Sequence, residues 1–259
     1  MSISVNALFN LSGKTALVTG GGQGIGRAIV LALAENGANV IVNYLSNYVL
    51  ARQTAEEAAL FGVKVWLWPF DLSQNNIVEA YQKFVLENGC NVDILVTNAS
   101  MQIRENWDEI SDNDFEKQIN VNIRSTLRLI ESVTPYMKKN KWGRILNIGS
   151  VQQVRPHNQM CVYAATKAAL VNLVKNLVPQ LAPYGITINN LAPGTIHTGR
   201  NNEVLADMDY RKKTEATIPL GFIGEPIDCA GLALLLCSDA GRYITGVDYL
   251  VDGGMGLCY

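Results

Sequence analysis

The sequence predicts an α/β protein: a seven-stranded, doubly wound parallel sheet with helices on both faces. Short apolar runs rich in β-branched residues alternate along the chain with longer helical stretches. Strands of a parallel sheet are buried on both faces, so they appear as continuous apolar runs, and their alternation with helices is typical of this class. The chain contains no linker rich in proline or serine and no internal repeat, so we expect a single domain over residues 1–259.

Seven apolar runs are the candidate strands. They cover Thr15–Val18, Ala38–Val42, Val63–Trp68, Val92–Val96, Arg144–Ile148, Thr187–Leu191 and Asp248–Val251. Helices are expected over Ile25–Asn36, Ala51–Phe61, Ile77–Glu87, Asp114–Lys139 and Ala164–Leu181. The least regular stretch, residues 195–222, is the candidate for a mobile lid. Ligands of such sheets bind beyond the carboxyl ends of the strands, so the residues that follow each strand are the candidate site.

Composition and charge narrow the classes of function. The net charge is −2, the pI is about 5.7, and lysine and arginine do not cluster, so we expect no nucleic-acid partner. No uncharged apolar run approaches the roughly 18 residues that a membrane-spanning helix needs. The first residues lack the pattern of a signal peptide, which favours a cytoplasmic location. Five widely spaced cysteines and only two histidines predict neither disulfides nor a metal site.

A glycine-rich turn lies between the first strand and the first helix. Gly20, Gly24 and Gly26 allow a tight turn and a close approach of backbone to a ligand. The helix that follows offers free N–H groups for a phosphate at its N-terminus. A tight turn without a ligand is the alternative, but the position favours a dinucleotide site that also includes Gln23 and Ile25.

Seven further motifs follow in order. They are Asp71-Leu72 after the third strand, Asn98-Ala99-Ser100 after the fourth, Asn122 in the next helix, Ser150 at the end of the fifth strand, Tyr163-Ala-Ala-Thr-Lys167, Pro193-Gly194 with Ile196 and Thr198, and Val251-Asp-Gly-Gly254. With the glycine turn they resemble the short-chain dehydrogenase/reductase family over essentially the whole chain. In that family Ser100 is usually glycine, so the serine adds a hydroxyl near the cofactor. The resemblance implies an NAD(P)-dependent oxidoreductase that interconverts an alcohol and a carbonyl.

Tyr163 and Lys167 are the candidate proton-transfer pair. They are four residues apart and therefore share one face of a helix. A phenol ionises near pH 10, and a nearby ammonium lowers that pKa, so the phenol can exchange a proton with an alcohol or a ketone. Ser150 is expected to hold the substrate oxygen beside the phenol. The resemblance also places Lys167 on the nicotinamide ribose and gives Asn122 a water that links Lys167 to solvent.

Plainer interpretations stand beside these roles. Tyr163 and Lys167 alone would be an ordinary half-buried aromatic residue and a solvated charge. Asn122 can bond the backbone within its helix, and that role is compatible with a proton relay. Asp71 either contacts the adenine, as the resemblance implies, or caps a helix that begins two residues later. Asn98 can serve mainly to brace neighbouring strands.

The end of the second strand indicates which cofactor is used. NAD-dependent relatives carry an acid at the position of Tyr44, and NADP-dependent relatives often carry arginine at the position of Leu45. Neither signal is present. The missing carboxylate removes repulsion against a 2′-phosphate, which Asn43 and Ser46 could bond, with Arg27 as a possible helper. The pattern favours NADP over NAD and leaves both open.

The segment between Ser150 and Tyr163 is expected to border the substrate. The candidate contacts are Gln152, Gln153 and His157 from this segment and Arg104 after the fourth strand; Gln102, Arg155, His197, Arg200 and Asn201 are further polar neighbours. Such a rim suits a small polyhydroxylated or acidic substrate, so a sugar or polyol is the main hypothesis. A 3-oxoacyl thioester (acyl-carrier-protein) reductase is the alternative, and a non-catalytic dinucleotide sensor is disfavoured by the complete tetrad. These polar side chains could also simply face solvent.

The resemblance further implies a homotetramer. Its contacts would involve the helices after the fourth and fifth strands, the last strand and the tail Met255–Tyr259. Apolar residues of the helix after the fifth strand could contribute, or could equally face the sheet; they are Val171, Leu173, Val174 and Leu177.

Overall fold

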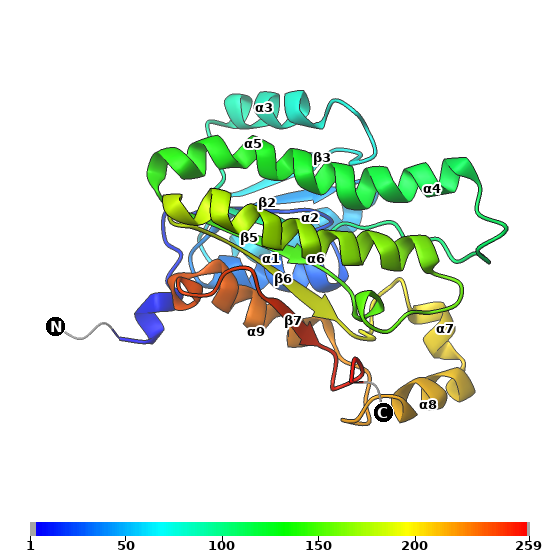
Figure 1. Cartoon of the computed structure of the whole chain (residues 1–259). Helices are drawn as coiled ribbons and strands as arrows, with labels where there is room; N and C mark the ends of the chain where they lie inside the picture. Colours follow the sequence, from blue (N-terminus) through cyan, green and yellow to red (C-terminus); the bar gives the residue numbers. More distant parts are fainter. Residues whose placement is uncertain (1–3, 258–259) are drawn as a thin grey trace.

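One parallel sheet forms the centre of the computed structural model, which describes residues 4–257 (Figure 1). Its strands are β1 (Thr15–Val18), β2 (Asn39–Tyr44), β3 (Val65–Pro69), β4 (Ile94–Thr97), β5 (Gly143–Ile148), β6 (Ile186–Pro193) and β7 (Asp248–Val251). Their order is β3-β2-β1-β4-β5-β6-β7, and every neighbouring pair is parallel. The predicted fold class is therefore confirmed.

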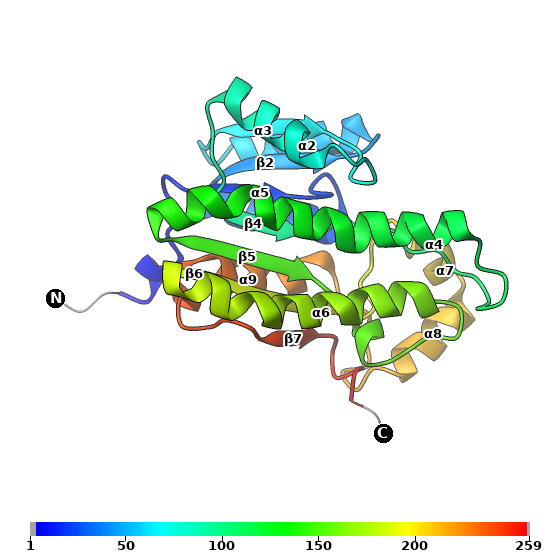
Figure 2. The same cartoon turned by 45° about the horizontal axis from the view of Figure 1, so that its top comes forward.

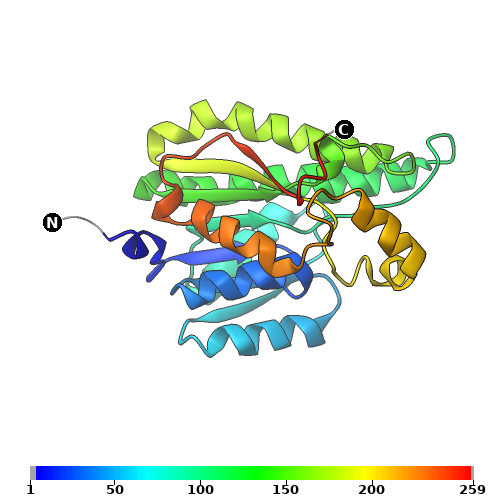
Figure 3. The same ribbon diagram turned by 90° about the horizontal axis from the view of Figure 1, so that it is seen from below.

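Helices cover both faces of the sheet. On one face lie α1 (Gly24–Glu35), α2 (Tyr48–Ala59) and α9 (Pro226–Cys237), which Figure 3 shows from below. On the other lie α3 (Ile77–Asn88), α5 (Ser125–Asn140) and α6 (Cys161–Leu181), with α4 (Asp112–Ile119) leading into α5. Side chains alternate along a strand, so Val18 enters one apolar core while Leu17 enters the other. This packing holds the carboxyl ends of the strands at one edge.

The helical stretch predicted over Asp114–Lys139 contains one widened turn. A π-helical segment, Asn120–Arg124, separates α4 from α5. Such widened turns are frequent at functional sites, and they displace one side chain from the helical register. Here the segment carries Asn122, whose side chain is buried. The predicted helical stretch is therefore confirmed, and the widened turn within it is a feature that the sequence did not predict.

The stretch 195–222 contains two short helices, α7 (Asn202–Ala206) and α8 (Met208–Ala216). Figure 2 shows them beyond the carboxyl ends of the strands. Leu205 and Ile218 form a small apolar cluster with Ile223, separate from the two main cores. Its mobility as a lid stays a prediction.

Membrane association has one structural test. Within residues 4–257, none of the helices combines the length and apolar character needed to cross a membrane.

Candidate active site

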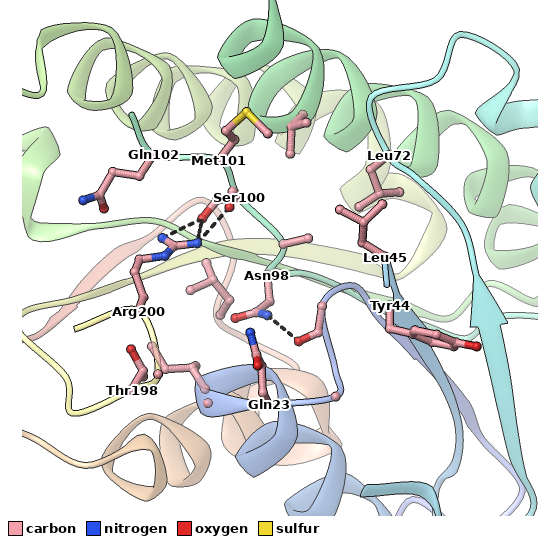
Figure 4. Close-up of a pocket in the computed structure, with 18 of the residues that line it drawn as sticks. Gln23, Tyr44, Leu45, Leu72, Asn98, Ser100, Met101, Gln102, Thr198 and Arg200 are labelled. Carbon is pink, nitrogen blue, oxygen red and sulfur yellow. Dashed lines mark hydrogen bonds between the residues drawn. The ribbon is translucent and has the colours of Figure 1, made fainter. Parts of the chain in front are cut away.

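A cavity of about 460 Å³ opens at the carboxyl ends of the strands (Figure 4). Its wall includes almost all of the residues predicted to hold a cofactor: Gly20, Gln23, Gly24, Ile25, Asn43, Tyr44, Ser46, Asp71, Leu72, Asn98, Ala99, Tyr163, Lys167, Pro193, Gly194, Ile196 and Thr198. Ser150 lines it as well. Gly26 and Asn122 do not line it and are buried. The fold thus brings together residues that are up to 178 positions apart, from Gly20 to Thr198.

The glycine turn forms a cradle at one end of the cavity. Gly20 and Gly24 have φ angles of +61° and +53°, which side chains rarely adopt. A β-carbon on Gly26 would lie 2.3 Å from the carbonyl oxygen of Gly20 and 2.6 Å from Nδ2 of Asn98. The first turn of α1 begins here without a side-chain cap, so its N–H groups are available to a ligand. These features fit the pyrophosphate of a dinucleotide.

Asn98 braces this cradle. Its Nδ2 donates to the carbonyl oxygens of Thr19 at 2.9 Å and Gly20 at 3.2 Å, while its backbone N–H donates to Thr19 Oγ1 at 2.8 Å. The strand-bracing interpretation of Asn98 therefore holds, although the residue also lines the cavity.

Two residues suggested for a 2′-phosphate have other partners. The amide of Asn43, 2% exposed, donates to the carbonyl oxygens of Trp68 and Phe70, each at 3.1 Å, and accepts from Gly20 N–H at 3.4 Å. Arg27 pairs with Glu57 on α2. Both side chains thus hold neighbouring elements together, and Arg27 points toward α2. Asn43 still lines the cavity, so its contact with a 2′-phosphate stays a prediction. Tyr44 and Ser46 remain at the cavity rim.

Asp71 closes a turn at the cavity edge. Its carboxylate accepts from Ser73 N–H at 2.8 Å and from Gln74 Nε2 at 3.2 Å. Burial raises its pKa, but these hydrogen bonds outweigh that effect and leave the pKa below its usual value. Helix α3 begins at Ile77, and its N-cap residue is Asn76. The interpretation of Asp71 as a helix cap was therefore wrong.

Tyr163 and Lys167 line the same cavity, near the start of α6. They are 5% and 2% exposed. Lys167 Nζ donates to the carbonyl oxygen of Ile148 at 2.7 Å and lies 5.6 Å from the centre of the Tyr163 ring. Ser150 follows β5, and its Oγ accepts from Gln152 N–H at 3.2 Å. These contacts position the ammonium and the serine hydroxyl around the phenol.

The surroundings of Tyr163 favour its phenolate. Burial by itself raises the pKa of the phenol, but the charges of Lys167 and Arg200 and the hydroxyls of Ser150 and Ser100 together bring the pKa below its usual value. Burial lowers the pKa of the Lys167 ammonium, and Tyr163 partly offsets this. A phenol with a lowered pKa is a more effective base at neutral pH.

Asn122 connects the loop after β4 to α6. Its amide oxygen accepts from Met101 N–H at 2.8 Å, and its Nδ2 donates to Met101 O at 2.9 Å and to Thr166 Oγ1 at 3.0 Å. Thr166 Oγ1 in turn donates to the carbonyl oxygen of Tyr163 at 2.7 Å. Asn122 thus positions the start of α6, and its role in a proton relay stays a prediction.

A second cavity, of about 440 Å³, adjoins the first at Gln102, Ser150, Gly194 and Asn201. Gln152, His157 and Arg104 line it, as expected of substrate contacts.

Gln153 lines neither of these two cavities. Its Nε2 donates to Asp248 Oδ2 at 2.6 Å and its Oε1 accepts from Asn190 at 3.4 Å, so it braces β6 and β7. The structure therefore does not bring Gln153 to the substrate side.

Comparison with known proteins identifies the family. A family model described as enoyl-(acyl carrier protein) reductase matches residues 20–256. L-rhamnose 1-dehydrogenase (NADP(+)) from Thermoplasma acidophilum is 36% identical over 249 residues, or 96% of this chain and 98% of that protein. The chain belongs to the short-chain dehydrogenase/reductase family.

Other short-chain dehydrogenases and reductases match at similar levels. The 3-oxoacyl-(acyl-carrier-protein) reductase of Aquifex aeolicus is 38% identical over 248 residues, covering 95% of this chain and 98% of that protein. The 3β-hydroxysteroid dehydrogenase 1 of Eggerthella lenta is 34% identical over 249 residues, with 96% and 95% covered. A crystal structure of a gluconate 5-dehydrogenase from Burkholderia cenocepacia, in complex with NADP and tartrate, superposes with a TM-score of 0.91 at 31% identity, covering 99% of this chain and 100% of that chain.

The chain is thus an NAD(P)-dependent oxidoreductase acting on CH–OH groups, as the sequence predicted. A bound nicotinamide would supply the hydride transfer to or from the substrate carbon. The geometry is suited to the accompanying proton transfer: the Ser150 hydroxyl can hold the substrate oxygen, and the Tyr163 phenol beside it can take or return the proton. Lys167 favours the phenolate electrostatically.

Arg200, which the sequence placed only among the polar neighbours of the substrate, has a specific partner in this short-chain dehydrogenase/reductase site. Its guanidinium donates to the backbone oxygen of Ser100 at 2.8 Å and to Ser100 Oγ at 3.2 Å (Figure 4). The contact joins residues 195–222 to the loop after β4. The sequence pointed to one half of this contact, because Ser100 stands where the family usually has glycine. That Arg200 is the partner of Ser100 is seen only in the structure.

Proposed function

We propose that the chain is an NADP-dependent dehydrogenase or reductase of a small polyhydroxylated substrate, such as a sugar or polyol. The observation that carries this proposal is Gln152, which lines the second cavity next to Ser150. Its Oε1 is buried and makes no hydrogen bond with any described residue. A buried acceptor left unpaired costs about 1–3 kcal/mol, so we expect the Gln152 amide to turn toward the cavity and accept a hydrogen bond when a substrate hydroxyl is bound there.

Other side chains support a hydroxylated substrate. Tyr210, Thr214 and Thr217 add hydroxyl groups to the same cavity wall. The similarity to an L-rhamnose 1-dehydrogenase agrees with this hypothesis. The chain is about equally similar to 3-oxoacyl-(acyl-carrier-protein) reductases. The test below therefore includes 3-oxoacyl thioesters as substrates.

For the cofactor we propose NADP, held by the cavity-lining residues named above with its pyrophosphate over the start of α1. Tyr44 presents no carboxylate to a 2′-phosphate. A relative at 36% identity is named as NADP-dependent, and a structural neighbour contains NADP. The tetrad roles of Asn122, Ser150, Tyr163 and Lys167 belong to the same proposal.

The test follows nicotinamide absorbance with NADP and NAD against sugars, polyols and 3-oxoacyl thioesters. We expect turnover of a sugar or polyol with NADP, and a fall of several orders of magnitude in Tyr163→Phe. Turnover of only the thioesters would replace this proposal with the alternative. Cofactor binding without turnover of any class would favour a sensor.

We also propose a homotetramer in the cytoplasm. Val174 is buried in the core, and Leu173 and Leu177 pack against that core with part of each side chain exposed. The edge strand β7 leaves Leu250 38% exposed, and Tyr243 before it is 99% exposed. Four of the five cysteines are free thiols, in keeping with a reducing compartment, and Cys258 and Tyr259 of the tail lie outside the described residues. A monomer in analytical ultracentrifugation would contradict the assembly.

A further inference from the structure

The second cavity carries charge of one sign. Every described lining residue that can be charged near neutral pH is basic: Arg104, Arg155, His157 and Lys213. The chain as a whole has a net charge of −2, so this concentration is local and does not follow from composition. Like charges around one cavity repel each other, and an anion bound among them would offset that repulsion.

The basic residues come from three separate parts of the fold. Arg104 follows β4, Arg155 and His157 follow β5, and Lys213 lies on α8. Arg155 is anchored, because its Nη1 donates to the backbone oxygens of Met255 at 2.9 Å and Thr217 at 3.3 Å. The cluster is therefore assembled by tertiary structure around the cavity, and it is not one solvated helix face.

His157 adds a directed donor to this cluster. Its Nδ1 accepts from Gln159 N–H at 3.2 Å, so a neutral imidazole carries its proton on Nε2. Burial and, after it, the neighbouring charge of Arg104 lower the His157 pKa, which favours the neutral ring. Arg104 and Lys213 then supply the positive charge. His157 offers a hydrogen-bond donor, Nε2–H, and Gln152 offers an acceptor, Oε1.

Among the described residues that line this cavity, none is acidic. Glu215, on the same helix as Lys213, pairs with Arg211 at 2.9 Å, and neither of those two residues lines the cavity. In the adjoining first cavity, Asp71 is the one acidic residue among the described lining residues. Asp71 follows β3 and is not among the residues, such as Ser150 and Gln102, at which the two cavities meet.

We propose that the substrate is a polyhydroxy acid whose carboxylate binds against Arg104 and Lys213 while its reacting carbon lies at Ser150 and Tyr163. This inference rests on the proposed function and narrows its substrate class. Ser150 lines both cavities, so the cavity that holds the phenol and the cavity that holds the basic cluster meet at the residue expected to hold the substrate oxygen. Arginine and lysine bind carboxylates through charge-assisted hydrogen bonds, which are stronger than neutral ones.

The experiment compares aldonates with the alditols of the same stereochemistry, gluconate with sorbitol and galactonate with galactitol. Wild type, Arg104→Gln, Lys213→Gln and the double variant are assayed with NADP. The control is Lys212→Gln, because Lys212 is exposed on the same helix and does not line the cavity. We expect KM for the aldonate to rise about tenfold in each cavity variant, with kcat, the alditol and the control little changed.

A binding measurement makes the test independent of turnover. The aldonate is expected to raise the melting temperature of the wild-type protein with NADP more than the alditol does, and to lose this advantage in the double variant. If alditols are used as well as aldonates and the variants do not discriminate, the inference is wrong while the proposed function stands. A sugar phosphate preferred over every aldonate would also overturn the carboxylate assignment. Turnover of 3-oxoacyl thioesters alone would instead remove the proposed function.

Discussion

Removing the side chain of Asn122 tests whether the π-helical segment positions the catalytic helix. In Asn122→Ala, a side chain that is 1% exposed loses three hydrogen bonds, two with Met101 and one with Thr166. Each buried bond contributes about 1 kcal/mol, and more when its partner is left unsatisfied, so we expect a loss of about 3–5 kcal/mol. For a chain of this size that corresponds to a fall in Tm of roughly 10 °C.

The assay is thermal unfolding followed by circular dichroism. Asn176→Ala is the matched control, because the Asn176 amide also bonds within α6, to Asn172 at 2.9 and 2.7 Å, but is exposed. We expect that control to change stability by less than about 1 kcal/mol. Thr166→Val removes the contact with Asn122 and also the hydrogen bond from Thr166 Oγ1 to Tyr163 O, so we expect a loss of about 2 kcal/mol. A melting temperature for Asn122→Ala within a few degrees of the control would refute this account of the site.

Three further predictions concern the cavity. Arg200→Gln removes a positive charge that favours the phenolate, so the pKa of Tyr163 rises. In alcohol oxidation, kcat/KM should then increase over a higher pH range than in wild type. An unchanged pH profile would show that Arg200 does not act on the phenol. Tyr44→Asp should lower kcat/KM with NADP by about tenfold or more and spare NAD, and equal losses with both cofactors would contradict the 2′-phosphate argument. Gly26→Ala should abolish cofactor binding in calorimetry, since its methyl would lie 2.3 Å from a carbonyl oxygen, whereas Gly231→Ala meets no atom within 4 Å and should bind normally.

Much of the fold could be predicted from local pattern. The runs Thr15–Val18 and Asp248–Val251 coincide with β1 and β7, because continuous apolar segments bounded by turns have few alternatives in a parallel sheet. The interruption at Asn120–Arg124 could not be predicted, since it depends on partners in the β4 loop and α6. Helical periodicity does not reveal where a distant contact will widen a turn.

Candidate site residues divide in the same way. Glycine spacing and the Tyr163–Lys167 pair are local, so they pointed correctly to the cavity wall. Asn43 and Gln153 were assigned to ligands because polar residues near strand ends often contact them, but both are bonded to neighbouring strands. A side chain's partner is chosen by competition among all groups within reach, and sequence shows only the nearest of them.

The sequence by itself determined the fold class, the family and the chemistry-bearing residues, because each depends on short patterns at strand ends. Only the tertiary structure decided which side chains face the substrate. It joined Arg200 to Ser100, 100 residues away, and gathered Arg104, Arg155 and Lys213 around one cavity. Electrostatic interactions depend on distance in space, and folding is what sets that distance.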